Sequence, residues 1–138
     1  MIYGSHRRPG VSERDMNHSL MNATSKNGID WQVGGEPLIA LAAGEMGHSR
    51  PWILEWQGQR HLLFSVRRDQ YAIWTARQQL DGTWTRGPAL SFDDARSGGW
   101  DGEARCYASH LQVDGVDYLF YNGNGYGRTG FGLAVLEA

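Results

Sequence analysis

The sequence lacks the features that define several common protein classes. Its 138 residues include one cysteine, Cys106, which excludes an intramolecular disulfide and a cysteine-based zinc cluster. No apolar run is long enough to span a bilayer, and the N-terminus, MIYGSHRRPG, has no apolar signal-peptide core. The formal net charge of −2 favours neither nucleic acid nor anionic membrane as a partner. These absences predict a soluble, cytoplasmic protein with no nucleic-acid or membrane partner.

Helical periodicity is missing as well. No segment sustains an i, i+3, i+4, i+7 apolar pattern over a dozen positions. The sequence instead contains 19 glycines, six tryptophans and six tyrosines. Aromatic side chains and glycine turns are typical of short antiparallel strands, so the composition predicts an all-β fold.

A possible nucleotide motif lies near the C-terminus, where Gly125–Gly130 reads G-x-G-x-x-G. A dinucleotide-binding loop with this spelling needs a following helix, whose N-terminus holds the pyrophosphate. Here only eight residues follow Gly130, and FGLAVLEA has the pattern of an apolar strand. We therefore predict two strands, YLFY and FGLAVLE, joined by a polar, glycine-rich connection, and no cofactor.

Three segments of the sequence are similar to one another. The first is Ile2–Trp31, the second is Leu63–Trp84, and the third begins at Tyr118. The first two each contain an apolar-aromatic strand ending in Arg-Arg, an alternating strand, and a turn closed by tryptophan. A repeat of roughly 50–60 residues made of short strands favours propeller blades over a sandwich.

The turns of the first two segments have sequences that favour hairpins. Asn27-Gly28 and Asp81-Gly82 suit a type I′ turn, whose central residues both have positive φ. Ser25–Trp31 is also close to the Asp-box of sialidases, Ser-x-Asp-x-Gly-x-x-Trp, but it is one residue short. We expect these residues to have structural roles.

Four segments together resemble the five-bladed β-propellers of glycoside hydrolase families 43 and 32, most closely family-32-like members: SKNGIDW, SRPWILEWQGQRHLLFSVR, GWDGEARCY and YNGNGYGRTGFGLA. The resemblance covers Tyr3 to Glu137 and corresponds to the later blades. It implies one partial propeller domain over residues 1–138, with two to three blades of short antiparallel strands. Because open blades leave exposed edges, we expect a homodimer or higher homo-oligomer to complete them.

The resemblance also implies a sugar-facing cavity with a general base, an orienting acid and a general acid. Glu103 matches the general-acid position, although Ala108 stands where the family has proline. Asp101 is two residues away on an expected strand, so both carboxyls face the same side, roughly 7 Å apart at Cα. This spacing is compatible with retaining and inverting hydrolysis. The base normally comes from a blade outside the resemblance, so a partner chain, Glu45 or Asp69 would have to supply it.

Other residues are candidates for substrate binding. Trp100 and Tyr107 offer aromatic faces that can stack on sugar rings, and the resemblance implies that Arg50 reaches the same cavity as Glu103. Amide and guanidinium groups that suit a polyol come from the loop near the C-terminus: Asn122, Asn124 and Arg128. Metal binding is not expected, because the histidines share no ligand-like spacing.

Each candidate has a structural alternative. Asp101 could cap a turn, Glu103 could pair with Arg105 or Arg96, and the asparagines could simply hold their loop together. Cys106 is expected to be a buried, unreactive side chain.

Three functions are compatible with the sequence. The chain could be a glycosidase-like enzyme, a non-catalytic carbohydrate-binding protein, or a structural protein in which the propeller remnant only assembles into homo-oligomers.

Overall fold

The computed structural model describes residues 1–8, 17–92 and 98–137. The fold is all-β, as predicted, and within these ranges only α1 (Asn124–Gly127) is helical. No described helix has the length and apolar character needed to cross a membrane. The strands are β1 (Ile2–Arg8), β2 (Asn17–Thr24), β3 (Gln32–Val33), β4 (Gly47–Trp56), β5 (Gln59–Arg67), β6 (Tyr71–Gln78), β7 (Trp84–Ala89), β8 (Cys106–Val113), β9 (Val116–Asn122) and β10 (Phe131–Val135).

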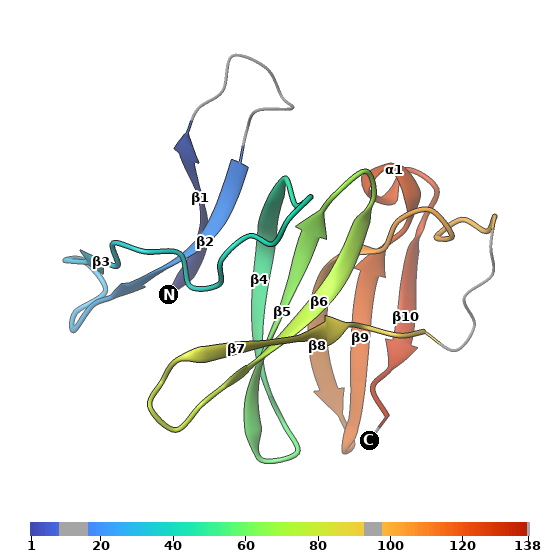
Figure 1. Cartoon of the computed structure of the whole chain (residues 1–138). Helices are drawn as coiled ribbons and strands as arrows, with labels where there is room; N and C mark the ends of the chain where they lie inside the picture. Colours follow the sequence, from blue (N-terminus) through green and yellow to red (C-terminus); the bar gives the residue numbers. More distant parts are fainter. Residues whose placement is uncertain (9–16, 93–97, 138) are drawn as a thin grey trace.

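The strands form three groups that follow one another in the chain (Figure 1). In the first group β2 pairs antiparallel with β1 and β3, and in the second β4, β5, β6 and β7 form an antiparallel meander. One parallel residue pair, His18 with Gly47, joins these two groups. The third group is a separate antiparallel sheet in the order β10-β9-β8. The described strands close no barrel, and the groups are partial propeller blades, as the resemblance implied.

Tight turns occur at different positions from those predicted. Gln57–Gly58 joins β4 to β5 with φ of 51° and 70°, and Asp114–Gly115 joins β8 to β9 with φ of 51° and 79°. Two-residue connections with two positive φ angles are typical of type I′ turns. The prediction of this turn at Asn27–Gly28 and Asp81–Gly82 is wrong, because only the glycine of each pair has positive φ. Both pairs lie in longer loops.

The loop between β2 and β3 is held together by its own side chains. The Asn27 Oδ1 atom accepts hydrogen bonds from the backbone N–H groups of Ile29 and Asp30, both at 2.9 Å. The Trp31 indole N–H donates to the Gly28 carbonyl at 3.1 Å. These contacts agree with a structural role for the loop.

The central β4–β7 blade is buried on both faces, because successive residues of a strand point to opposite sides. Leu62, Phe64 and Val66 of β5 pack with Leu20 and other residues of the first group. Leu63, which alternates with them, packs on the opposite face with residues of the third group: Ala108, Leu119 and Tyr121. Two hydrophobic cores therefore hold the three groups together.

Cys106 is 1% exposed at the start of β8, which confirms its predicted burial. Burial raises the pKa of its thiol to about 11. The reactive thiolate is therefore scarce at neutral pH.

Candidate functional site

Two strands are bulged near their N-terminal ends. Arg50 lies in a register shift between β4 and β5, and Tyr107 lies in a register shift between β8 and β9. Both residues have left-handed backbone, with φ of 51° and 61°. Bulges redirect side chains, and strained non-glycine residues concentrate at functional sites. For this reason, we consider the surface that these two side chains share to be a candidate functional site.

That surface is a cluster of three tyrosines, Tyr71, Tyr107 and Tyr126. The Tyr107 and Tyr126 rings stack with centroids 6.1 Å apart, and the Tyr71 ring meets them edge-on at 5.9 and 5.5 Å. The Arg50 guanidinium lies 5.5 Å from the Tyr107 ring centroid. Tyr126 also has left-handed backbone, with φ of 62°, and its side chain is 59% exposed. Outside the two tight turns, every described non-glycine residue with positive φ belongs to this group.

The hydroxyls of Tyr71 and Tyr107 remain protonated near neutral pH. Burial raises the pKa of Tyr71 well above its ordinary value, and the neighbouring Tyr107 and Tyr126 raise it further. Burial also raises the pKa of Tyr107, although the Arg50 charge opposes this. Neutral phenols can donate and accept hydrogen bonds, so both groups suit a hydroxylated ligand.

Two hollows meet at Tyr71. We call the first, of about 510 Å³, the Arg50 hollow; its lining consists of Gly4, Ser5, His18, His48, Ser49, Arg50, Pro51, Tyr71 and Tyr107. We call the second, of about 640 Å³, the Glu103 hollow; its lining consists of Met46, Arg67, Arg68, Asp69, Gln70, Tyr71, Glu103, Ala104, Cys106, Gly125 and Tyr126. Each of the three tyrosines thus lines at least one hollow: Tyr107 lines the first, Tyr126 lines the second, and Tyr71 lines both.

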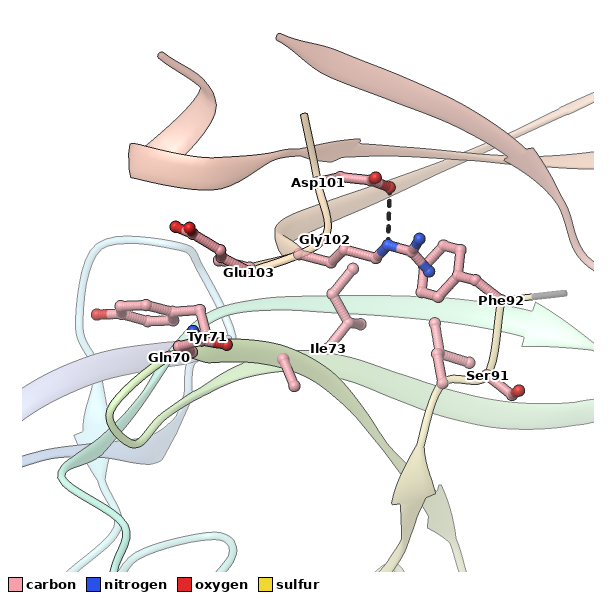
Figure 2. A pocket seen from close by; sticks show the side chains of 12 residues that line it. Gln70, Tyr71, Ile73, Ser91, Phe92, Asp101, Gly102 and Glu103 are labelled. Carbon is pink, nitrogen blue, oxygen red and sulfur yellow. Dashed lines mark hydrogen bonds and ion pairs between the residues drawn. The ribbon is translucent and has the colours of Figure 1, made fainter. Parts of the chain in front are cut away.

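Asp101 and Glu103 lie in the loop before β8 rather than on a strand, so the expected same-face arrangement is wrong. Both side chains line one depression of about 530 Å³, but they point in different directions (Figure 2). The Asp101 carboxylate accepts a hydrogen bond from the Arg105 guanidinium. Glu103 points away from Asp101, on the side where Tyr71 lies (Figure 2). The two carboxyls do not converge on one bond.

The two acids also differ in their surroundings. Asp101 is 8% exposed and accepts hydrogen bonds from Arg105 Nε at 2.8 Å and from the Tyr121 hydroxyl at 2.9 Å. The Glu103 side chain is exposed, and its carboxylate has no hydrogen bond or ion pair with the described residues. The expected alternative pairing of Glu103 with Arg105 is not formed, because Asp101 occupies that guanidinium. Arg96 lies outside the described residues.

The asparagines of the C-terminal loop are used by the fold. Asn124 Oδ1 accepts hydrogen bonds from the backbone N–H groups of Glu103 and Ala104, both at 2.9 Å. Asn122 Nδ2 donates to the Tyr126 carbonyl at 3.2 Å. The two amides therefore hold the segments that carry Glu103 and Tyr126, as the structural alternative expected.

Trp100 and Arg128 lie apart from the tyrosine cluster. The Trp100 ring stacks on Tyr121 at 5.7 Å, and the Arg128 side chain is exposed. Neither is among the described residues that line the Arg50 hollow or the Glu103 hollow. The expectation of one cavity shared by Glu103, Asp101, Trp100 and Arg50 is therefore wrong: only Asp101 lines a depression together with Glu103.

Glu45 occupies a buried ion-pair cluster. Its carboxylate accepts hydrogen bonds from His48 Nε2 at 2.9 Å, Arg86 at 2.9 Å, Arg68 at 3.3 Å and the Ala42 amide at 2.9 Å. Burial alone raises the pKa of this carboxyl, but hydrogen bonds from Arg86, Ala42 and His48 outweigh burial and hold the pKa well below its usual range. Glu45 is too deeply paired to serve as the missing base, whereas Asp69 lines the Glu103 hollow.

Two buried polar atoms border the Arg50 hollow. Burial lowers the pKa of His48, although Glu45 opposes this, so the ring is neutral and its Nε2–H donates to Glu45. His48 Nδ1 is then an acceptor, and neither it nor Ser49 Oγ has a hydrogen-bond partner among the described residues. Such atoms cost about 1–3 kcal/mol each when unsatisfied, and both are closed to solvent in this structure.

The comparisons with known proteins concern the fold. No protein-family model matches the chain. Two uncharacterized proteins of Mycobacterium tuberculosis, from strains H37Rv and CDC 1551, are each 30% identical to it over 138 residues. The match covers 99% of this chain but 46% of each relative, so the chain spans about half the length of the curated relatives it matches.

Solved structures share the same architecture. A glycoside hydrolase superposes with a TM-score of 0.72 and 20% identity, covering 99% of this chain and 40% of that one. A mutant of the Bombyx mori GH32 β-fructofuranosidase BmSUC1 in complex with sucrose gives 0.72 and 14%, covering 99% and 31%. A thermostable family-43 glycoside hydrolase gives 0.66 and 16%, covering 99% and 46%. The chain therefore has the propeller fold of glycoside hydrolase families 43 and 32, over less than half the length of those enzymes.

Proposed function

We propose that the tyrosine cluster and its two hollows bind a carbohydrate. The observation that carries this proposal is the contact between three strained residues, Arg50, Tyr107 and Tyr126, at adjoining bulges and loops. Aromatic faces with neighbouring hydroxyl, guanidinium and carboxylate groups suit the apolar face and hydroxyl rim of a sugar ring. The sucrose complex of a structure with the same fold supports this class of ligand.

Glycosidase activity is the finer part of the proposal and assigns Glu103 as the general acid. Asp101 is held by Arg105, so it serves as an auxiliary acid that orients the loop rather than as the base. Asp69, which lines the same hollow as Glu103, is the described acid best placed to assist. Sugar binding does not require hydrolysis, so the binding proposal does not depend on glycosidase activity.

Carbohydrate binding is tested by removing the exposed ring. We expect Tyr126→Ala to weaken binding on a glycan array and in calorimetric titration of the bound glycans by about tenfold, because stacking area is lost. Trp31→Ala removes a comparably exposed aromatic ring from the distant β2–β3 loop and should leave binding unchanged. An array on which the native protein retains no glycan contradicts the proposal.

Catalysis is tested separately with activated aryl glycosides. An activated leaving group needs little help from a general acid, so glycosides with poor leaving groups are tested alongside. Hydrolysis of these by the native protein that Glu103→Gln abolishes supports the enzyme. Glycan binding without any hydrolysis leaves a carbohydrate-binding protein.

Assembly into a homodimer is the second candidate function, and it is favoured by the edge strand β10. Phe131, Leu133 and Val135 alternate along β10 and are 75%, 56% and 51% exposed. Among the described strands β10 pairs only with β9, so its other edge is open to a second copy. Two chains would supply about the length of the relatives, of which one chain covers 46%. The proposed interface joins β10 to β10 across a two-fold axis.

Light scattering after size-exclusion chromatography tests this assembly. We expect native protein to elute as a dimer and Leu133→Lys to elute as a monomer, because a charge replaces an apolar interface residue. Leu80→Lys, on the exposed β6–β7 hairpin, should remain dimeric. A native monomer of 15.4 kDa at tens of micromolar rejects the assembly.

A further inference from the structure

The two hollows beside Tyr71 differ in charge. Among the described residues that line the Arg50 hollow none is Asp or Glu, and Arg50 carries its one guanidinium. Hydroxyl groups of Ser5, Tyr71 and Tyr107 complete the polar lining. This depression therefore presents a positive charge and several hydrogen-bond donors without a competing carboxylate.

The Glu103 hollow has a mixed lining. It contains Asp69 and Glu103 together with Arg67 and Arg68, and Arg68 already pairs with Glu45. Its two carboxylates offset the charge of Arg67, so it offers an anion less net positive charge than the Arg50 hollow, whose described lining contains no acid. The two sides of the site therefore differ in charge, with the more positive side at the Arg50 hollow.

Arg50 is held in a position where its charge is available. The bulge and the left-handed backbone direct its side chain toward Tyr107, and the guanidinium forms no ion pair with a described carboxylate. A guanidinium binds planar carboxylates and phosphates through two parallel hydrogen bonds, which a lysine cannot reproduce. A strained arginine with no ion pair to a described carboxylate, in a depression with no acid among its described lining residues, suits an anion better than a neutral hydroxyl.

We propose that the ligand is an anionic saccharide, whose carboxylate or phosphate binds Arg50 in the Arg50 hollow while its sugar ring lies on the tyrosine cluster. This inference rests on the proposed carbohydrate-binding function and adds the class of the ligand.

Calorimetric titration with matched probes tests the proposal. Trigalacturonate is compared with neutral galactotriose, glucose 6-phosphate with glucose, and inorganic phosphate is titrated alone. At least one acidic sugar should bind about tenfold tighter than its neutral parent, and salt near 0.5 M should remove most of that advantage. Preference within the first pair identifies a carboxylate, and preference within the second identifies a phosphate.

Variants of two arginines complete the test. Arg50→Gln should abolish the preference, because it lowers the affinity for the acidic sugar to about that for its neutral parent. Arg60→Gln alters an exposed arginine near the start of β5, next to the β4–β5 turn and away from Arg50. This variant should retain the preference. Circular dichroism and the melting temperature establish that both variants are folded.

Three outcomes overturn the inference in distinguishable ways. Equal binding of acidic and neutral sugars rejects the anionic ligand but leaves carbohydrate binding intact. Inorganic phosphate binding as tightly as glucose 6-phosphate, with no preference for trigalacturonate over galactotriose, rejects the contribution of the sugar ring. Absence of binding to every probe rejects this inference together with the function on which it rests.

Discussion

Glu45 and Glu103 illustrate two opposite uses of a carboxylate in one small protein. The Glu45 side chain is fully buried and is paired with two arginines and a histidine. The Glu103 side chain is exposed beside Tyr71 and has no partner among the described side chains. One acid joins segments of the central blade, and the other is available to a ligand.

The comparison teaches where the fold can tolerate change. A carboxylate that is fully desolvated and paired is costly to alter, because its partners are then left with uncompensated charge. An exposed, unpaired carboxylate can be removed with little effect on folding, so its presence is more informative about function. Substitutions at the two kinds of acid should therefore separate stability from ligand binding.

The largest expected effect is that of Glu45→Gln. Removing this charge leaves Arg86 and Arg68 without their common partner, which should lower the free energy of unfolding by about 3–5 kcal/mol. Urea unfolding followed by tryptophan fluorescence measures the loss. Glu55→Gln, which alters an exposed pair with Arg60, should change stability by less than about 1 kcal/mol. Similar values for the two variants would remove the distinction between buried and exposed acids.

Acid titration should reveal the same cluster. The folded-state pKa of Glu45 lies below that of the unfolded chain, about 4.3 for glutamate. Between these two values the unfolded chain binds more protons, so the stabilisation by Glu45 is complete above about pH 5 and is lost as the pH falls. The difference in unfolding free energy between native protein and Glu45→Gln should therefore shrink below pH 4. A difference that is independent of pH contradicts the depressed pKa.

Much of the fold could be predicted from the sequence, because strand patterning is local. FGLAVLE was expected to be a strand and contains β10, so a strand follows G-x-G-x-x-G where a dinucleotide-binding loop needs a helix. The turn predictions were less successful, because the turn that an Asn-Gly or Asp-Gly pair forms depends on how the surrounding strands pair. Asp114–Gly115 has the favoured spelling and makes the tight turn, whereas Asp81–Gly82 is placed in a longer loop by the pairing of β6 with β7.

The candidate site was harder to predict, because it depends on contacts between distant segments. Arg50 and Tyr107 were identified as candidates, but nothing in the sequence indicated that bulges bring them together. Tyr71 and Tyr126 were missed, although Tyr126 lies between two glycines inside the G-x-G-x-x-G stretch. The pairing of Glu45 with Arg86 spans 41 positions and has no local signature.

An intermediate effect is expected for Asp101→Asn. Asp101 is buried and accepts hydrogen bonds from Arg105 and Tyr121, so the change should cost about 1–3 kcal/mol. Asp114→Asn is the matched control, because asparagine suits the same type I′ turn and the site is exposed. Chemical unfolding of both proteins makes the comparison. A negligible loss at Asp101 would place it with Glu103 as a free acid.

A gain in stability is expected for Arg50→Gly. Glycine adopts a φ of 51° without the strain that a side chain causes, so the variant should be more stable by up to about 1 kcal/mol. Ser49→Gly, at a neighbouring position without positive φ, should instead lose about 0.5–1 kcal/mol. Differential scanning calorimetry measures both changes, and glycan binding should be weakened in the Arg50 variant. Destabilisation by Arg50→Gly would indicate that the arginine serves the fold.

The smallest effect on stability is expected for Glu103→Gln. Its carboxylate is exposed and forms no described ion pair, so the free energy of unfolding should change by no more than about 0.5 kcal/mol. The side chain lines two depressions beside Tyr71, and glutamine preserves its size while removing the ability to transfer a proton. Hydrolysis of a glycoside with a poor leaving group, where the native protein supports it, should therefore be lost together with any contribution of the charge to binding. The two measurements are informative together. Native-like unfolding with altered ligand behaviour assigns Glu103 to the site. A loss of unfolding free energy near that of Glu45→Gln, with unchanged ligand behaviour, assigns Glu103 to the fold.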